Sequence, residues 1–219
     1  MSQSLSITPF TSDDLPVLAG FLHTAKLNLA INRLLIREWP NEVPQKANCT
    51  NAIQGSLNDP DSECLKAVDT ATGDILGFAV LTRKRPQAQP QDAGEGDSDA
   101  PKSQCPDFMN PTVFNSVMQA ASELGKVVQG VDHFDITYIY VKPSHRRTGI
   151  ASKLLDTFKE RCKAESLPLC IQIEPAGYRF FISQGFEDNG HHDFDLAQWA
   201  EPNSGLGVFR LAAAKWVPK

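Results

Sequence analysis

The spacing of apolar residues along the chain alternates between a helical period and the short runs of strands. Every fourth residue from Ile150 to Cys162 is apolar, which indicates an amphipathic helix. Short, nearly continuous apolar runs come before and after it, at residues 133–141 and 169–173. Runs of this length are typical of buried strands. This part of the chain therefore predicts a strand–helix–strand unit.

The same patterns predict further elements on both sides of this unit. A hydroxyl, two acids and an early proline at residues 11–16 indicate the start of a helix. Turn-forming residues at 69–74 predict a hairpin. The expected strands are 5–10, 64–68, 75–82, 133–141, 169–173, 186–193 and 207–213, and the expected helices are 11–25, 27–38, 45–57, 113–128, 150–162 and 178–184. With no internal repeat, this order predicts one mixed α/β domain over residues 1–219.

Residues 85–106 interrupt this alternation. The segment is rich in Pro, Gln, Gly, Asp and Ala and has almost no large apolar residue. Such a composition buries too little surface to offset the entropy of the chain. We interpret it as a weakly ordered insertion between a strand and a helix. A surface loop is favoured over a lid on the site, because most loops have no such role.

Composition and charge restrict the partners. The net charge is −5, which argues against nucleic acid, because nucleic-acid-binding proteins usually carry a basic face. No apolar stretch is long enough to span a bilayer, and no signal peptide precedes the first predicted strand. The five cysteines are scattered and form no C-x-x-C pair, which favours reduced thiols and a cytoplasmic protein. The oligomeric state, monomer or homodimer, stays open.

A basic turn joins the strand at 133–141 to the following helix. It reads Arg146-Arg147-Thr148-Gly149-Ile150-Ala151. The first turn of a helix has free backbone N–H groups and a partial positive charge, so it attracts anions. Gly149 has no Cβ, which allows an anion to approach the backbone closely. The segment therefore predicts a phosphate-binding loop, whereas the nucleotide-binding motifs G-x-G-x-x-G and G-x-x-x-x-G-K-[ST] are absent from the sequence.

The pattern Arg-x-x-Gly-x-Ala after a strand that ends Val-Lys-Pro resembles the acyl-CoA-binding signature of the GCN5-related N-acetyltransferase (GNAT) superfamily. The clear match runs over residues 132–186. Within it, Pro-Ala-Gly-Tyr178 followed by Gly185-Phe186 is similar to a group of fungal GNAT-like proteins. The resemblance implies one domain with a mixed, mostly antiparallel sheet, splayed between two parallel strands and covered by helices on both faces.

The resemblance also implies where acetyl-CoA, the co-substrate, would bind. It would lie in a V-shaped gap between the strands 133–141 and 169–173. The backbone of Ile139, Tyr140 and Val141 would pair with the pantetheine amides, and the amides of residues 146–151 would hold the pyrophosphate. Tyr178 and Phe181 would flank the thioester or the pantetheine arm.

Acetyl transfer to an amine requires a base, because a protonated amine is not nucleophilic. Asp135 lies six residues before Val141, the spacing at which histone-type members of the superfamily carry their glutamate base. A solvated acid at a strand start is the competing interpretation. Asp132 and His133 are weaker candidates. In a plain strand Asp135 would share a face with Thr137 and Ile139, whereas a bulge would change that arrangement.

At the acid that would protonate the departing thiolate, the chain departs from the family. Many members carry tyrosine four residues before the Gly-Phe pair, where this chain has Phe181. The acid would then be Tyr178, Tyr140 or Tyr138, or none would be needed. A thiol with a pKa near ~8.5 leaves tolerably unaided, so the loss of that tyrosine should slow transfer and not abolish it.

His191, His192 and Asp193 are residue types that bind metals, but adjacent strand residues point to opposite faces, so no metal is expected. These residues, like Trp39 and Trp199, would instead line the acceptor pocket or pack. The favoured function is acetyl-CoA-dependent N-acetyl transfer to the primary amine of a small molecule, by direct attack in a ternary complex. The alternatives are a protein or peptide N-acetyltransferase, which needs an open groove, and a non-catalytic acyl-CoA-binding module.

Overall fold

The computed structural model describes residues 5–86 and 104–219. Their strands form one seven-stranded sheet in the order β1-β2-β3-β4-β5-β7-β6. All neighbouring pairs are antiparallel except β4 and β5, which are parallel. The strands are β1 Leu5–Pro9, β2 Ser62–Asp69, β3 Ile75–Lys84, β4 His133–Val141, β5 Leu169–Ile173, β6 Glu187–Asp195 and β7 Val208–Trp216. The prediction of a mixed, mostly antiparallel sheet is confirmed.

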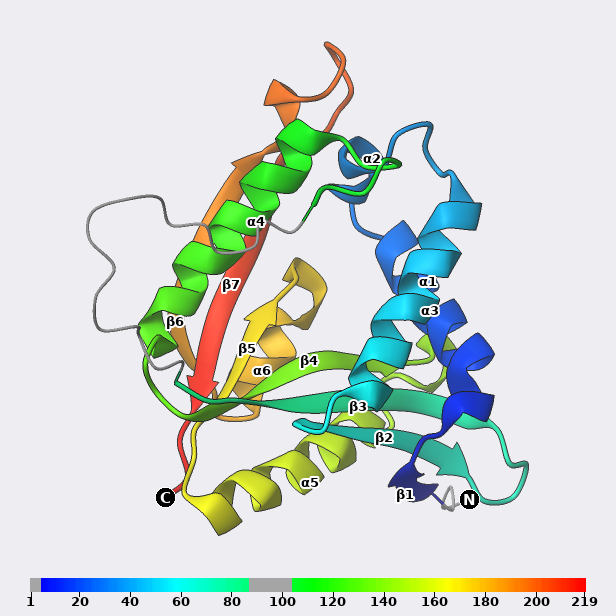
Figure 1. Ribbon diagram of the computed structural model, residues 1–219, viewed down its shortest axis with the longest axis vertical. Coiled ribbons are helices and arrows are strands. Elements are labelled where there is room, and N and C mark those ends of the chain that lie inside the picture. The colour runs from blue at the N-terminus through cyan, green and yellow to red at the C-terminus, as the bar shows by residue number, and fades with distance from the viewer. Residues whose placement is uncertain (1–4, 87–103) are drawn as a thin grey trace.

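Helices cover both faces of the sheet (Figure 1). On one face α1 and α3 lie over β2–β4, and α4 lies over β6 and β7. On the other face α5 packs against β2–β4, and α6 follows β5. The helices are α1 Leu15–Leu27, α2 Asn32–Leu35, α3 Glu42–Asn58, α4 Pro111–Gly125, α5 Ile150–Glu165 and α6 Tyr178–Ser183. None of these helices is long and apolar enough to cross a membrane.

Three apolar clusters hold the layers together. The largest fills the α5 side of the sheet, and its fully buried members include Leu154 and Phe158 of α5. The second lies beneath α1 and α3 around Phe78. The third joins α2 and α4 to β6 and β7 around Val113 and Phe194. The four-residue spacing from Ile150 onward was thus correctly interpreted, because Ile150, Leu154, Phe158 and Cys162 are all buried.

The prediction of a helix over 27–38 is wrong. Its helical part is only α2, four residues long. The Asn32 side chain donates a hydrogen bond to the carbonyl of Lys26 at 2.8 Å, near the end of α1. After α2 the chain becomes extended and Ile36 forms an isolated bridge with Met109. Polar side-chain bonds and a distant backbone partner therefore override the helical periodicity of this segment.

Backbone hydrogen bonds join the segments around Ile36 and Met109 at one end of the molecule, and we call this connection the strap. The N–H of Arg37 donates to the carbonyl of Phe108 at 2.9 Å, and the N–H of Asn110 donates to the carbonyl of Leu35 at 2.7 Å. Here Asn110 also caps α4, since its side chain accepts from the Thr112 N–H at 3.0 Å. The strap, residues 35–37 and 108–110, ties the chain that follows α1 to the start of α4 (Figure 1).

Other helix and strand boundaries differ from expectation by a few residues. The helix expected at 113–128 is α4, which ends at Gly125 and is followed by a 3-10 turn at Lys126–Val128. The expected insertion at 85–106 lies mostly outside the described residues, so its order and its proposed role as a loop or lid stay predictions.

Candidate functional site

The two parallel strands at the centre of the sheet separate after a short contact. β4 and β5 pair only at Phe134 with Leu169 and at Asp135 with Cys170. Both strands continue beyond this contact, β4 as far as Val141. Beyond it, the edge of β4 that faces β5 leaves backbone polar groups for another partner. The predicted V-shaped gap is therefore present, and Asp135 lies at its closed end.

A β-bulge at Thr137 changes which side chains share a face of β4. Ile136 pairs with Leu81 and Tyr138 pairs with Val80, so Thr137 is the extra residue. As a result Asp135 and Tyr138 lie on one face, whereas Ile136 and Ile139 pack into the α5-side core. The expectation for a plain strand, that Asp135 shares a face with Ile139, is wrong because the bulge shifts the alternation of faces.

The face that carries Asp135 is the one covered by α1, α3 and α4. Tyr138 packs into the cluster beneath α1 and α3. Burial raises the pKa of Tyr138 and of Tyr140. The hydroxyl of Thr137 contacts that of Thr82 at 2.7 Å, and the Thr137 side chain is exposed. The face therefore has a polar, open part beside the bulge, with two tyrosines behind it.

The predicted phosphate loop has the backbone of an anion-binding turn. Arg147 and Gly149 have φ values of 66° and 86°, a left-handed conformation that favours glycine. A Cβ added at Gly149 would meet no heavy atom within 4 Å. The backbone there is open to an approaching group, at the start of a 16-residue helix whose first N–H groups have no partner within the helix.

The two arginines of the loop are exposed, but Arg146 is held in place. Its Nε donates to the carbonyl of Val141 at 3.2 Å, and its guanidinium carbon lies 5.9 Å from the centre of the Tyr140 ring. The hydroxyl of Thr148 donates to the His145 carbonyl at 2.6 Å. Ile150 is buried and anchors the helix. The structure thus places residues 146–151 together as one exposed, positively charged turn directly after β4.

An ion pair links the two sides of the gap on the α1 face. The Nζ of Lys26, near the end of α1, lies 3.0 Å from Oε1 of Glu174, directly after β5. Both side chains are about two-fifths exposed, at 40% and 39%. Sequence reasoning missed this pair, because its residues are 148 positions apart and neither belongs to a recognisable motif.

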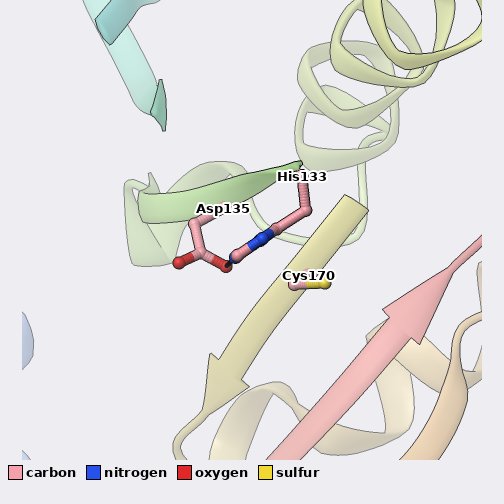
Figure 2. A group of neighbouring side chains, drawn as sticks. All are labelled: His133, Asp135 and Cys170. Atoms are coloured by element: carbon pink, nitrogen blue, oxygen red, sulfur yellow. Dashed lines mark ion pairs between the residues drawn. The ribbon is translucent and has the colours of Figure 1, made fainter. Parts of the chain in front are cut away.

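A second polar group lies at the closed end of the gap (Figure 2). It consists of His133 and Asp135 from β4 and Cys170 from β5, and their donor atoms lie within 4.8 Å of one another. Asp135 raises the pKa of His133 against the lowering effect of burial. Burial raises the pKa of the Cys170 thiol to about 12. Asp135 and Cys170 also line a cavity of about 290 Å³ beneath the end of α4.

Tyr178 and Phe181 are the two predicted site residues that belong to α6. The Tyr178 hydroxyl donates to Asp188 of β6, and this hydrogen bond raises the pKa of the tyrosine. Phe181 is only 3% exposed, and its ring contacts those of Phe180 and Phe186 with centroids 5.1 and 5.3 Å apart. The structure therefore directs the Tyr178 proton toward β6 and places Phe181 in the core.

The other residues considered for the site, on β6 and at Trp199, do not form one group. His191 and Asp193 are exposed on β6, and Asp193 forms a double hydrogen bond with Arg210 at 2.7 and 2.6 Å. Trp199 packs against Phe194 with ring centroids 6.1 Å apart, in the cluster formed by α2, α4, β6 and β7. The packing interpretation of Trp199 is thus the one that its contacts support.

Comparison with known proteins defines the class. Residues 116–188, about a third of the chain, match the model of the "Acetyltransferase (GNAT) domain". This segment contains the separating strands and the 146–151 loop. The fold is that of the GNAT N-acetyltransferases, which are acyltransferase enzymes. The prediction of an acyltransferase fold is confirmed at this level. No curated protein sequence matches the chain.

Solved structures agree with this fold at low sequence identity. A mosquito arylalkylamine N-acetyltransferase like 5b is 12% identical with a TM-score of 0.64, and the match covers 98% of this chain and 100% of that one. Arabidopsis thaliana NAA60, solved with a bisubstrate analogue, is 12% identical with a TM-score of 0.56 over 99% of each chain. A Sinorhizobium meliloti phosphinothricin acetyltransferase, solved with acetyl-CoA, is 16% identical with a TM-score of 0.53, over 100% and 89%.

Proposed function

We propose that this protein is an acetyl-CoA-dependent N-acetyltransferase that acts on the primary amine of a small molecule. The observation that carries the proposal is the separation of β4 from β5 directly beside the 146–151 loop. A free strand edge suits the amides of pantetheine, and an exposed, basic helix start suits a pyrophosphate. The residues present therefore fit acetyl-CoA, the compound with which the Sinorhizobium relative was solved.

In this proposal the chain holds the co-substrate along β4. The backbone of Ile139, Tyr140 and Val141 pairs with the pantetheine arm. The amides of residues 146–151, with the charges of Arg146 and Arg147, bind the pyrophosphate. Acetyl-CoA supplies the activated acetyl thioester, and a free backbone N–H near Tyr140 or Val141 stabilises the negative charge that develops on its oxygen. No step of this transfer requires a metal.

Asp135 is the proposed base. It lies on the face that α1 and α4 border, and it lines the cavity at the closed end of the gap. A primary amine enters as an ammonium ion and must lose a proton before it attacks. The Asp135 carboxylate accepts that proton, directly or through one water, and attack then takes place in a ternary complex.

Departure of the thiolate is the step that needs the least help from the protein. Tyr178 was predicted as its acid, but the tyrosine hydroxyl donates to Asp188. A thiolate of pKa about 8.5 is a tolerable leaving group without help. We therefore expect Tyr178→Phe to retain most of its transfer activity, with a loss below the ~10²-fold that marks general acid catalysis.

The strap favours a small acceptor over a peptide. It joins the chain after α1 to the start of α4 through backbone bonds of 2.9 and 2.7 Å. Those two elements border the acceptor face of the gap, so the strap bridges the space between them (Figure 1). A peptide substrate needs a groove that is open along its length. The strap is the observation that favours a small-molecule N-acetyltransferase over a peptide N-acetyltransferase such as a NAA60-like enzyme.

Two finer proposals accompany this function. The closeness to fungal GNAT-like proteins is proposed from the Pro-Ala-Gly-Tyr and Gly-Phe runs alone. A cytoplasmic location is proposed from the five free thiols of the described chain, three of which are buried. Fractionation of the native host cell with an antibody against the protein would test this location.

The proposed function is tested by acetyl-CoA binding and thiol release. Calorimetry measures binding, and a thiol reagent then measures release with polyamines, arylalkylamines, amino acids and basic peptides. Release with one small amine class, and its loss in Asp135→Asn with acetyl-CoA binding retained, is the expected result. Binding without release on any acceptor favours a non-catalytic module. Release with basic peptides alone contradicts the small-molecule assignment, and no binding contradicts the site.

A further inference from the structure

Three metal-binding side chains meet at the closed end of the gap (Figure 2). His133 and Asp135 are two residues apart on β4, so they extend from the same face of the strand. Asp135 pairs with Cys170 across the parallel contact of β4 and β5. This register brings an imidazole, a carboxylate and a thiol together, with their donor atoms within 4.8 Å of one another.

The imidazole of His133 is fixed by its backbone contact. Nδ1 lies 2.7 Å from the carbonyl oxygen of Val131, and a carbonyl only accepts, so Nδ1 carries the hydrogen. In the neutral ring the lone pair then belongs to Nε2, which faces Asp135. Metal-binding histidines typically donate their second ring N–H to a carbonyl or carboxylate in this way.

The spacing of the donors suits a shared ion better than a direct hydrogen bond. Nε2 of His133 lies 3.7 Å from Oδ1 of Asp135, longer than the 2.7–3.2 Å of a typical N–H···O bond. In a tetrahedral zinc site with ordinary bond lengths, neighbouring ligand atoms lie about 3.3–3.7 Å apart. The histidine and aspartate are thus near the required separation, and the Cys170 sulfur, within 4.8 Å of both donor atoms, has to move closer to share the ion.

The donor set and its charge select the kind of ion. Thiolate and imidazole favour zinc over magnesium or calcium, which prefer oxygen ligands. One thiolate and one carboxylate neutralise a dication, which lowers the cost of holding it in a partly buried place. Lys84 and Lys215 also line the adjacent cavity of about 290 Å³, and they would face a neutral complex. The cavity has room for a water as the fourth ligand.

We propose that His133, Asp135 and Cys170 form a zinc-binding site that is separate from the acetyl-CoA loop and inhibits transfer when it is filled. Binding releases the thiol proton to solvent and leaves the ion with three protein ligands and one water. The inhibitory part rests on the proposed function, because a bound ion occupies the carboxylate of Asp135. The binding part does not depend on it.

The test uses the full-length, reduced protein after treatment with a chelator. Cobalt(II) chloride is added as a spectroscopic substitute for zinc, and absorption is recorded from the near ultraviolet to the visible. One equivalent should produce the thiolate-to-cobalt charge-transfer band and the visible bands of tetrahedral cobalt. One equivalent of zinc should then remove both. Cys170→Ser should abolish the charge-transfer band, whereas Cys105→Ser, which changes a partly buried cysteine outside the three-residue group, should keep it.

His133→Gln provides the second variant. It removes the nitrogen ligand but keeps the thiol, and it should weaken zinc binding in competition with a chromophoric chelator by at least about tenfold. Circular dichroism checks that both variants fold. If either variant unfolds, the wild-type spectrum decides alone. Absence of the charge-transfer band in the wild type, or a band that persists in folded Cys170→Ser, overturns the site.

Inhibition is measured separately, on the acceptor that gives thiol release. Zinc at a concentration that saturates the cobalt-competition assay should inhibit the wild type at least about tenfold more strongly than Cys170→Ser. Zinc binding without inhibition overturns the inhibitory role but leaves the site. A chain that transfers no acetyl group still binds cobalt if the site is real, so failure of the proposed function is told apart from failure of this inference.

Discussion

Lys26 and Glu174, 148 positions apart, form an ion pair of 3.0 Å between the end of α1 and the chain that follows β5. A polyamine acceptor carries, besides the amine that reacts near Asp135, a second ammonium of the same chemical kind as that of Lys26. Because both side chains are about two-fifths exposed, such a pair stabilises the fold by at most about 1 kcal/mol. An acceptor ammonium would therefore replace Lys26 at Glu174 at little cost.

Glu174→Gln should raise the KM for a polyamine acceptor by about tenfold, because the charge-assisted hydrogen bond to its second ammonium is lost. Steady-state thiol release measures this effect, and kcat and acetyl-CoA affinity should change little. Lys26→Met is the matched variant, since it removes the competing ammonium and should leave KM unchanged or lower it. A rise in KM of equal size in both variants would mean that the pair is only structural.

Gly149→Asp should abolish acetyl-CoA binding measured by calorimetry. The new side chain would place a carboxylate in the open space beside Gly149, where a Cβ meets no atom within 4 Å, and it would repel a pyrophosphate. Gly73→Asp is the matched control, because Gly73 has a similar φ of 78° and equally open surroundings in the β2–β3 hairpin. Equal acetyl-CoA affinity in the wild type and folded Gly149→Asp would contradict the phosphate-loop assignment.

Phe181→Tyr should lower stability without raising kcat. Phe181 is 3% exposed, so a hydroxyl there would be buried among aromatic rings, at a cost of about 1–3 kcal/mol. Phe181→Ala should cost about 3–5 kcal/mol, typical of removing a buried phenylalanine. Urea denaturation measures both. An increase in kcat on restoring the tyrosine would instead show that this position reaches the thioester.

Asp14→Asn should reduce stability at neutral pH and matter less in acid. Burial raises the pKa of Asp14, but hydrogen bonds from Lys66 and Thr11 outweigh it, so the net pKa is lowered from 3.8. A lowered carboxyl pKa stabilises the fold above the unfolded-state value, and this contribution is lost as the pH falls through the folded-state value. The Lys66 Nζ lies 2.8 and 2.7 Å from the two carboxylate oxygens.

The measurement for Asp14→Asn is the free energy of unfolding in urea at several pH values. The variant should be less stable than the wild type by about 1–3 kcal/mol between pH ~5 and 8. The difference should shrink below the unfolded-state pKa of ~3.9. Asp13→Asn, in the same turn but exposed, is the control. A difference that stays constant from pH ~7 down to pH ~3 would exclude ionisation as its cause.

The exposed basic turn at residues 146–151 was predictable because its residues are contiguous. Gly149 and the arginines before it follow a strand and precede a helix, and each of these elements has its own local signal. The order of strands and helices was predictable for the same reason. The helix expected at 27–38 failed because Ile36 pairs with Met109, a partner that the local periodicity does not reveal.

The polar groups beside the gap were only partly predictable. His133 and Asp135 were singled out from the sequence, whereas no local signal distinguished Cys170 from the other scattered cysteines. Their meeting depends on the register of two strands that pair at only two positions. Lys26 and Glu174 likewise depend on the tertiary fold. A sequence pattern specifies which face of an element is apolar, but the choice of neighbour across a gap comes from the packing of the whole sheet.

The bulge at Thr137 allows β4 to hold one extra residue without exchanging its two faces. Because successive strand residues alternate between faces, deleting Thr137 would remove the bulge and leave Asp135, Ile136, Tyr138 and Ile139 in regular alternation on their present faces. Inserting one residue elsewhere in β4 would instead turn the side chains on one side of the insertion to the opposite face. Deletion of Thr137 should therefore be far less damaging than a single-residue insertion elsewhere in β4, although either change alters the chain by one residue.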